Sequence, residues 1–404
     1  MSGRKMRLYQ RVILAASALL QFSSNSFVSC STDSTIYSEW MAKSIVSRSQ
    51  GIVTGTGGSS ELLQAGFTQK AFRRLLELNA SAEIRQTLED YITESVNSVV
   101  PVLSNATNAL TAYPLDRFSS GNNLLALSES TGNASIKEGL QGLLESDDLQ
   151  PRNPEGGLWY FKVYPEWSYL DGMFSYAPFY LSYAASELSD PTKREDIVND
   201  VLYQIELLWQ HCYREDLGLL VHGYDDSLTA VWVNSNDTEK TGRSPYVWGR
   251  SLGWYMMALV DSLELALTNA TESESLVLES LMPKFQYLSA SILHAADKET
   301  GGWYQIVDQG GREKNYIESS ASAMFVYSSL KGARLGLLAQ AEEYVEAAKK
   351  AYGYIVDTFV VRNETDGTLG YNGTVSVCSL NSTATYEAGL SFTWSLLQLI
   401  CLLQ

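Results

Sequence analysis

Amphipathic helical segments are the pattern that most limits how this chain can fold. In the stretches 256–267 and 344–359, apolar residues recur every three to four positions, the period of a helix with one buried face. The 404 residues include only nine prolines, and no proline-rich or serine-rich linker follows Ser38. Because proline interrupts helices and such linkers separate domains, we expect one continuous, mostly helical domain over residues 37–404.

Loops of similar composition lie between the helical segments. Each opens with glycine, continues through bulky apolar residues and precedes another helix; these loops are residues 156–159, 218–222 and 301–305. One loop type recurring between helices favours repeated helical hairpins arranged in a toroid. The predicted fold is therefore an all-α, (α/α)-type barrel in which the loops at one end line a central pocket.

Composition and charge exclude several classes of function. Hydrophobic residues make up 45% of the chain and charged residues 19%, which is typical of a globular protein. The formal net charge of −17 disfavours nucleic acid or an anionic membrane as a partner. The sequence lacks a phosphate-binding loop, a dinucleotide fingerprint and a nucleophile elbow. We therefore expect neither a cofactor nor a serine hydrolase.

The N-terminus has the pattern of a signal peptide over residues 1–29. Four basic residues between positions 4 and 11 precede an apolar run at 12–20 that is too short to span a bilayer. The cleavage junction stays open between Ser26 and Cys30. Eight asparagines lie in Asn-x-Ser/Thr, where about three would occur by chance; they are Asn79, Asn105, Asn133, Asn236, Asn269, Asn363, Asn372 and Asn381. We expect a secreted, extracellular glycoprotein that is free of the membrane after cleavage.

Cysteine and histidine are scarce. The four cysteines are too scattered for a disulfide framework; Cys212 and Cys378 form either one bridge or two buried thiols. None of the three histidines has a second histidine or cysteine at metal-ligand spacing, so we expect no metal site.

Two aspartates are candidates for acid–base chemistry. Asp171 lies among apolar and aromatic neighbours just before a helix-like run at 174–185. Burial raises the pKa of a carboxyl group, as a general acid near neutral pH requires; the alternative is an inert helix cap. Asp116 also precedes a helix-like stretch, and could equally be a cap or a surface partner of Arg117.

Aromatic rings near acids and an arginine are typical of a sugar site. The chain has 33 Trp and Tyr residues, whose faces stack on sugar rings. Arg250 lies between Trp248 and Trp254, and its planar fork suits a uronic acid carboxylate. The alternative is a loop held by cation–π stacking without a ligand. His222 lies in another glycine and aromatic loop.

These segments, in this order, resemble glycoside hydrolase family 105, the unsaturated rhamnogalacturonyl hydrolases with a six-hairpin (α/α)6 barrel. The similarity extends from about residue 37 to about residue 386. It is most specific at residues 169–173 (YLDGM), 248–254 (WGRSLGW), 298–308 (KETGGWYQIVD) and 318–323 (ESSASA).

The resemblance implies roles for individual residues. Asp171 would be the catalytic acid/base and Asp116 its neighbouring carboxylate, whose negative charge would keep Asp171 protonated. The predicted substrate contacts are His222, Trp248, Arg250 and Trp254. The implied substrate is an unsaturated uronic-acid oligosaccharide from pectin, hydrated at its C4=C5 double bond by an enzyme that we expect to be monomeric.

The chain departs from the family after about residue 386, where the final helix of the barrel is expected to be missing or replaced. This departure puts closure of the barrel and activity in question. Alternative functions are an unsaturated glucuronyl hydrolase of the related family 88, an inactive sugar-binding paralogue, and an inverting glucanase on the same barrel.

Overall fold

Helices form most of the computed structural model, which describes residues 37–56, 58–78, 80–233, 240–268, 272–375 and 390–391. The α-helices of this part of the chain are α2 (Tyr37–Ser47), α3 (Glu61–Glu77), α4 (Ala82–Leu103), α5 (Ala106–Ala112), α6 (Gly121–Thr131), α7 (Ala134–Asp148), α8 (Gly172–Glu187), α9 (Pro191–Cys212), α10 (Gly249–Thr268), α11 (Glu272–Ala295), α12 (Ser319–Arg334) and α13 (Ala341–Phe359). Three 3-10 helices accompany them: η1 (Gly58–Ser60), η2 (Leu115–Ser120) and η3 (Val307–Gln309). None of the described helices is both long and apolar enough to cross a bilayer.

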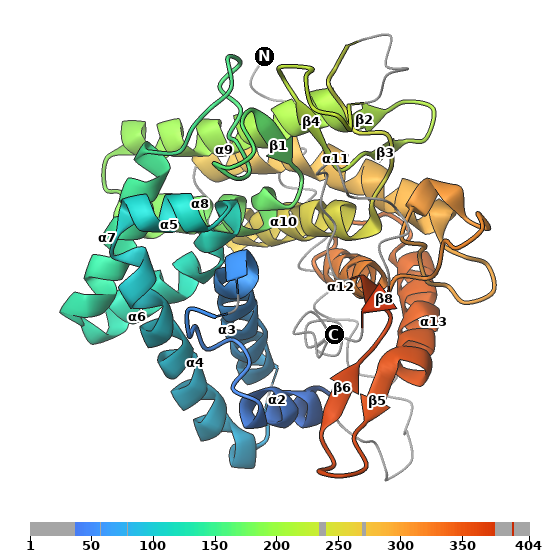
Figure 1. Ribbon diagram of the computed structural model, residues 1–404, viewed down its shortest axis with the longest axis horizontal. Helices are drawn as coiled ribbons and strands as arrows, with labels where there is room; N and C mark the ends of the chain where they lie inside the picture. The colour runs from blue at the N-terminus through green and yellow to red at the C-terminus, as the bar shows by residue number, and fades with distance from the viewer. Residues whose placement is uncertain are drawn as a thin grey trace, which may run out of the picture. The chain divides into compact units, whose positions relative to one another are not determined.

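Inner and outer helices alternate along the unit that begins at Ser38 (Figure 1). The inner helices are α3, α6, α8, α10 and α12. Between α3 and α8, η2 packs against both helices; α8 in turn contacts α10, and α10 contacts α12. Their outer neighbours are α4, α7, α9, α11 and α13. This is the predicted barrel of helical hairpins. The predicted loss of its final helix concerns residues after about 386, which lie outside the described residues apart from 390–391.

Sequence periodicity predicted two of these helices correctly. The stretch 256–267 lies within α10 and the stretch 344–359 within α13. α10 is buried on nearly all sides because other helices pack around it, whereas α13 buries a narrow face. Elsewhere, local signals determine where a helix begins: at the start of α9 the Asp190 side chain accepts a hydrogen bond from the Thr192 N–H, and Pro191 occupies the first turn.

Close packing between inner elements fixes the segment that carries Asp116. Gly66 of α3 faces η2, where a Cβ atom would lie 2.3 Å from the carbonyl carbon of Ser119. The Ser119 hydroxyl donates to the Leu62 carbonyl at 2.8 Å. Since only glycine allows this approach, the sequence of α3 determines where η2 lies.

A buried cluster of charges joins three inner helices. Asp261 of α10 accepts hydrogen bonds from Lys70 of α3 and, at 2.6 Å, from Lys331 of α12. Burial by itself would raise the pKa of Asp261, but Lys331 and Lys70 lower it to about 2. Lys331 also pairs with Glu264 at 2.5 Å. Beside this cluster, residues of α3, η2, α6, α8, α10 and α12 line a cavity of about 500 Å³.

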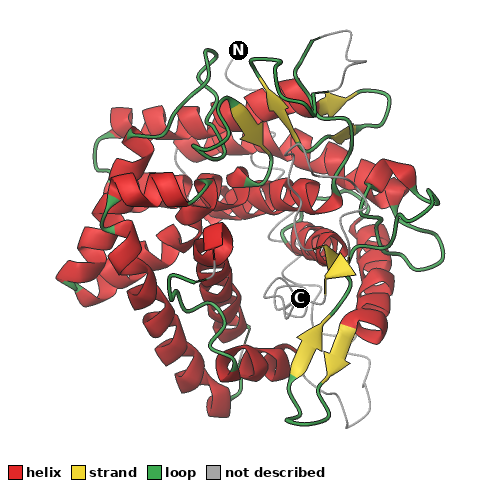
Figure 2. Cartoon of the chain, viewed as in Figure 1, coloured by secondary structure: helices red, strands yellow, loops and turns green. Residues whose placement is uncertain are grey.

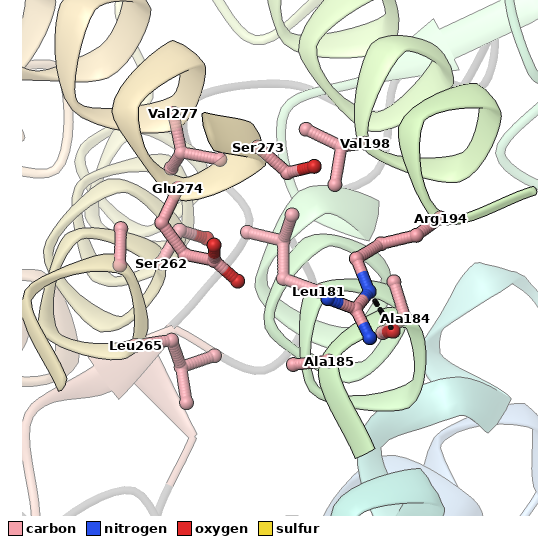
Figure 3. Close-up of a pocket in the computed structure, with 11 residues that line it drawn as sticks. Leu181, Ala184, Ala185, Arg194, Val198, Ser262, Leu265, Ser273, Glu274 and Val277 are labelled. Atoms are coloured by element: carbon pink, nitrogen blue, oxygen red, sulfur yellow. Dashed lines mark hydrogen bonds between the residues drawn. The ribbon is translucent and has the colours of Figure 1, made fainter. Parts of the chain in front are cut away.

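A second, smaller cavity lies between α8, α9, α10 and α11 (Figure 3). Its volume of about 10 Å³ is of the order that one water molecule needs. Two buried polar atoms on its wall, Ser262 Oγ and Glu274 Oε2, have no hydrogen-bond partner, and Arg194 donates instead to the Ala184 carbonyl. The cavity is too small to hold a sugar.

Short strands lie in the loops at the helix ends (Figure 2). Their bounds are β1 (Trp167–Tyr169), β2 (Tyr213–Arg214), β3 (Leu219–Leu220), β4 (Gly223–Asp225), β5 (Val360–Arg362), β6 (Leu369–Tyr371), β7 (Thr374–Val375) and β8 (Leu390–Ser391). They form the antiparallel pairs β1–β4, β2–β3, β5–β6 and β7–β8. In the first pair Tyr169 lies opposite Gly223, which brings Leu170 and Asp171 beside His222.

Candidate active site

The predicted site residues precede or begin inner helices. Asp116 lies in η2 before α6, Asp171 lies directly before α8, and Arg250 lies in the first turn of α10. Because inner helices separated by outer helices run in the same direction, their N-terminal ends gather at one end of the barrel. The fold therefore brings together residues that are far apart in sequence.

Asp171 occupies the N-cap position of α8 but does not act as a cap. Its side chain makes no hydrogen bond to the backbone of the helix, which removes the inert alternative. Instead, Oδ2 accepts a hydrogen bond from the hydroxyl of Ser251, a residue of α10. Asp171 is 9% exposed, so the residue is mostly buried but keeps some solvent-accessible surface.

His222 lies beside this carboxyl group. Its Nε2 is 3.2 Å from Asp171 Oδ2, and the residue has no exposed surface. Within the described part of the chain neither ring nitrogen has a hydrogen-bond partner of good geometry, and Tyr169 and Trp248 pack against the ring with centroids 4.8 and 5.7 Å away. A buried imidazole without hydrogen bonds costs folding free energy unless a ligand supplies the missing partner. This fits the predicted contact of His222 with a substrate.

Asp116 is buried as well, and Tyr160 is its hydrogen-bond partner. The Tyr160 hydroxyl donates to Asp116 Oδ2 at 2.7 Å, and its ring stacks on Tyr169 at 4.8 Å. Arg117 is turned away, with its guanidinium donating to Ser146 and to other acceptors on its own side. The surface salt bridge considered for Asp116 is therefore wrong.

Burial raises the pKa of Asp116 to about 7, and the charge of Asp171 adds to the shift; the Tyr160 hydrogen bond and Arg117 oppose it. The charges of both aspartates also contribute to a strongly raised pKa for Tyr160, although burial is the main cause. The charges of the two carboxyl groups therefore influence each other, while their roles in catalysis stay predictions. The prediction placed a negative charge on Asp116, whereas burial raises the pKa of Asp116 and so favours its protonated form.

Arg250 is held by α12 and the chain after it. Nε donates to Ser320 Oγ at 2.9 Å, Nη2 donates to the Val375 carbonyl, and Nη2 lies 3.5 Å from Glu318 Oε1. Glu318 is 1% exposed and also caps α12 by accepting from the Ala321 N–H at 2.6 Å. The guanidinium thus already faces one carboxylate, and its contact with a uronate stays a prediction.

The two tryptophans around Arg250 differ in their surroundings. Trp248 packs against His222, next to Asp171. Trp254 lies one turn further into α10 and contacts Phe67 and Phe174, with centroids 5.6 and 4.5 Å away. Both are less than 5% exposed. Trp248 is therefore placed at the site, whereas Trp254 is packed in the core, and a substrate contact for either stays a prediction.

Sequence reasoning gave no role to several residues that hold the site. Ser251 and Tyr160 donate to the two aspartates, and Glu318 pairs with Arg250. Ser251 and Glu318 lie in motifs that were noted, but their partners are 80 and 68 positions away in the chain. Spacing alone cannot identify such pairs.

The other predictions fall on the surface or outside the described residues. Asn105 and Asn133 are exposed, Asn363 and Asn372 partly so, while Asn79, Asn236, Asn269 and Asn381 lie outside. Cys212 is a buried thiol, and Cys378 lies outside the described residues, so the choice between one bridge and two buried thiols stays open. Residues 1–29 also lie outside the described part of the chain.

A helical barrel with two interacting, buried carboxyl groups among aromatic rings defines the class of barrel glycoside hydrolases. Comparison with known proteins agrees. The family model described as Glycosyl Hydrolase Family 88 matches residues 39–392, and the chain belongs to this family.

Solved structures share the fold. A glycoside hydrolase from family 105 of C. acetobutylicum ATCC 824 is 28% identical, with a TM-score of 0.74 over 91% of this chain and 99% of that one. The unsaturated glucuronyl hydrolase of Bacillus sp. GL1 has a TM-score of 0.60 at 14% identity, over 91% and 95% of the chains, which shows the fold alone. Protein Atu3128 of Agrobacterium fabrum is 34% identical over 196 residues, 48% of this chain and 78% of the relative.

Proposed function

We propose that this glycoside hydrolase is an unsaturated rhamnogalacturonyl hydrolase, which removes the unsaturated galacturonyl residue from pectin fragments made by lyases. The observation that carries the proposal is the buried pair Asp116 and Asp171, in which the pKa of Asp116 is raised to about 7. Support for this substrate class comes from the motifs shared with family 105 and from the similarity to the C. acetobutylicum family 105 structure.

The proposed reaction adds water across the C4=C5 double bond of the terminal sugar. A carboxyl proton adds to C4, which leaves an oxocarbenium-like centre at C5. The carboxylate formed then takes a proton from water as the water oxygen bonds to C5. The hemiketal opens at the ring oxygen to a ketone at C5, and the hemiacetal left at C1 releases the remaining sugar as an alcohol.

In this reaction Asp171 transfers the proton and Asp116 supports it. Ser251 donates to Asp171 Oδ2 and His222 lies beside the same oxygen, so the proposed reaction uses Oδ2 as the fixed oxygen and Oδ1 for the proton transfer. A neighbour with a pKa near 7 keeps a proton within the pair at neutral pH, because two adjacent negative charges repel.

The deciding experiment measures turnover of an unsaturated galacturonyl-rhamnose disaccharide through loss of the ultraviolet absorbance of its conjugated uronate. A matched reaction uses an unsaturated glucuronyl-hexosamine disaccharide. We expect faster turnover of the rhamnose-linked substrate. Preference for the hexosamine-linked one would assign the family 88 type of substrate, and saturable binding without turnover of either would identify an inactive sugar-binding protein.

We further propose that the protein is secreted and carries N-linked glycans. The exposed Asn133 supports this: its Oδ1 accepts from the Ser135 N–H at 2.9 Å, which leaves the amide nitrogen available for a sugar. Expression of the full chain in eukaryotic cells should give a protein in the medium whose electrophoretic mobility increases after endoglycosidase treatment. Retention in the cells without glycans would contradict the proposal.

A further inference from the structure

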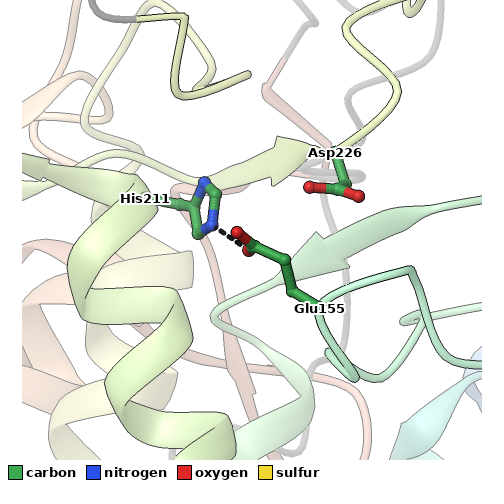
Figure 4. Close-up of side chains that lie close together, drawn as sticks. All are labelled: Glu155, His211 and Asp226. Carbon is green, nitrogen blue, oxygen red and sulfur yellow. Dashed lines mark hydrogen bonds and ion pairs between the residues drawn. The ribbon is translucent and has the colours of Figure 1, made fainter.

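Three side chains of the types that bind metal ions lie close together near the end of strand β4. Glu155 comes from the loop after α7, His211 from the last turn of α9, and Asp226 from the turn after β4 (Figure 4). One ligand-type atom from each lies within 4.8 Å of the others. Spacing in the sequence did not suggest this group, because its members are 56 and 15 positions apart.

The hydrogen bonds of His211 determine what its second nitrogen can do. Nδ1 lies 2.8 Å from the Thr241 carbonyl, and a carbonyl only accepts, so Nδ1 carries the proton. In a neutral ring Nε2 then has a lone pair, yet it lies 2.7 Å from Glu155 Oε2, another acceptor. Two lone pairs repel at this distance unless a second proton or a metal ion lies between them.

This arrangement is the one found around metal-binding histidines. Their second ring nitrogen donates to a backbone carbonyl or carboxylate, which fixes the tautomer and orients the ring. Here Tyr224 also holds the ring, which it stacks on at 4.0 Å with an interplanar angle of 8°. His211 is therefore oriented before any ion arrives.

Asp226 supplies the third ligand. Its carboxylate accepts no hydrogen bond from the residues that the structure describes, and Figure 4 shows it facing the Glu155 side of the group. Glu155 and Asp226 are both acidic, and ligand-type atoms of the two lie within 4.8 Å of each other. A cation between the two acids would relieve their repulsion.

We propose that Glu155, His211 and Asp226 bind one divalent transition-metal ion, with Zn²⁺ as the best match. One imidazole nitrogen and two carboxylate oxygens are ligands that Zn²⁺ accepts at about 2.0–2.2 Å, and they leave a fourth position for water. Tetrahedral geometry places such ligands about 3.4 Å apart, so the contact between His211 and Glu155 opens slightly and Asp226 moves inward. The exposed Glu155 lets the ion enter from solvent.

The ion would tie together three segments that support the active site. Strand β4 directly precedes Asp226 and pairs with β1, which ends two residues before Asp171. Asn153 in the Glu155 loop donates to Tyr224 of β4 at 3.1 Å. The metal is thus a structural brace for the loops and takes no part in the reaction proposed above.

The experiment is a Zn²⁺ titration of the tag-free, full-length protein by calorimetry and by equilibrium dialysis with metal analysis. We expect one ion per chain and a melting temperature that rises with Zn²⁺ concentration. His211→Ala should weaken binding by at least about 100-fold, since even loss of an outer hydrogen bond costs roughly 10–100-fold. Asp226→Asn, which keeps the stacking of His211 on Tyr224, should also weaken it.

The matched control is His294→Ala, because His294 is exposed on α11 and far in sequence from the group. It should bind Zn²⁺ like the wild type. Binding should also weaken in acid, where protons compete for His211 and the carboxylates. Absence of saturable binding, or equal affinity in all three variants, would overturn the proposal and leave a protonated ion pair between His211 and Glu155.

Discussion

Replacing Asp116 by asparagine should abolish or strongly reduce activity and yet stabilise the protein above neutral pH. The wild-type carboxyl group has a folded-state pKa of about 7, against an ordinary value of 3.8, mainly because it is buried. The folded state therefore holds a proton that the unfolded state releases between about pH 4 and pH 7. Over this window the free energy of unfolding falls as pH rises, because the unfolded state binds fewer protons than the folded state.

The size of the effect follows from the shift. A difference of about 3 pKa units, at 1.36 kcal/mol each, corresponds to about 4 kcal/mol, an upper limit for a pair of coupled carboxyl groups. Asparagine has the same shape, does not titrate and can still accept the Tyr160 hydrogen bond through its Oδ1. Above pH 7 the variant should therefore be more stable than the wild type by about 2–4 kcal/mol, and near pH 4 the two should be nearly equal.

Urea denaturation of both proteins at pH 4, 6 and 8 measures this difference, and titrating groups that do not interact with Asp116 cancel in the comparison. Asp171→Asn serves as the control, because removing its charge takes away one cause of the raised Asp116 pKa and should flatten the wild-type pH dependence in part. A stability difference that stays constant with pH, or an Asp116→Asn variant that is less stable at pH 8 than the wild type, would refute the reasoning.

Four other substitutions test the site and the fold. Asp171→Asn should lower kcat by about 10²–10⁴ with an unchanged circular dichroism spectrum, and near-normal turnover would remove Asp171 from the mechanism. Arg250→Lys keeps the charge but loses the planar fork, so KM should rise or kcat/KM fall; a change in melting temperature alone would make Arg250 structural. Gly66→Ala should destabilise by about 1–3 kcal/mol in urea denaturation, because its Cβ would overlap Ser119, and wild-type stability would show that η2 can shift. Asp261→Asn should cost about 3–5 kcal/mol in the same assay, because it removes the carboxylate that Lys70 and Lys331 share and leaves Lys331 only its contact with Glu264, whereas a loss under 1 kcal/mol would mean that Glu264 and water compensate.

The helices could be predicted from sequence because their signals are local. The apolar period at 256–267 and 344–359 depends on neighbours within two turns, and α10 and α13 contain these stretches. The strand pair β1–β4 could not be predicted, since three residues per strand are too few for an alternating pattern and its paired residues are 54 to 58 positions apart.

The candidate site shows the same limit. Motif resemblance pointed to Asp116, Asp171 and His222, and the fold does place the last two side by side. It could not reveal that Arg250 already faces Glu318, or that the pKa of Asp116 is raised. Both depend on burial and on partners supplied by distant helices, which a single sequence does not contain.

The first and last described hairpins depend on each other, and this affects how the chain folds during synthesis. The Trp40 indole in α2 donates to the Gly367 carbonyl 327 residues later, and the Leu369 N–H next to it in β6 donates to the Ser44 hydroxyl. A ribosome adding about 5–20 residues per second needs roughly 16–65 s to make the chain between these partners. During that interval α2 lacks its partners Gly367 and Leu369. The slowest and most aggregation-prone stage of folding should therefore precede the synthesis of residues 367–369.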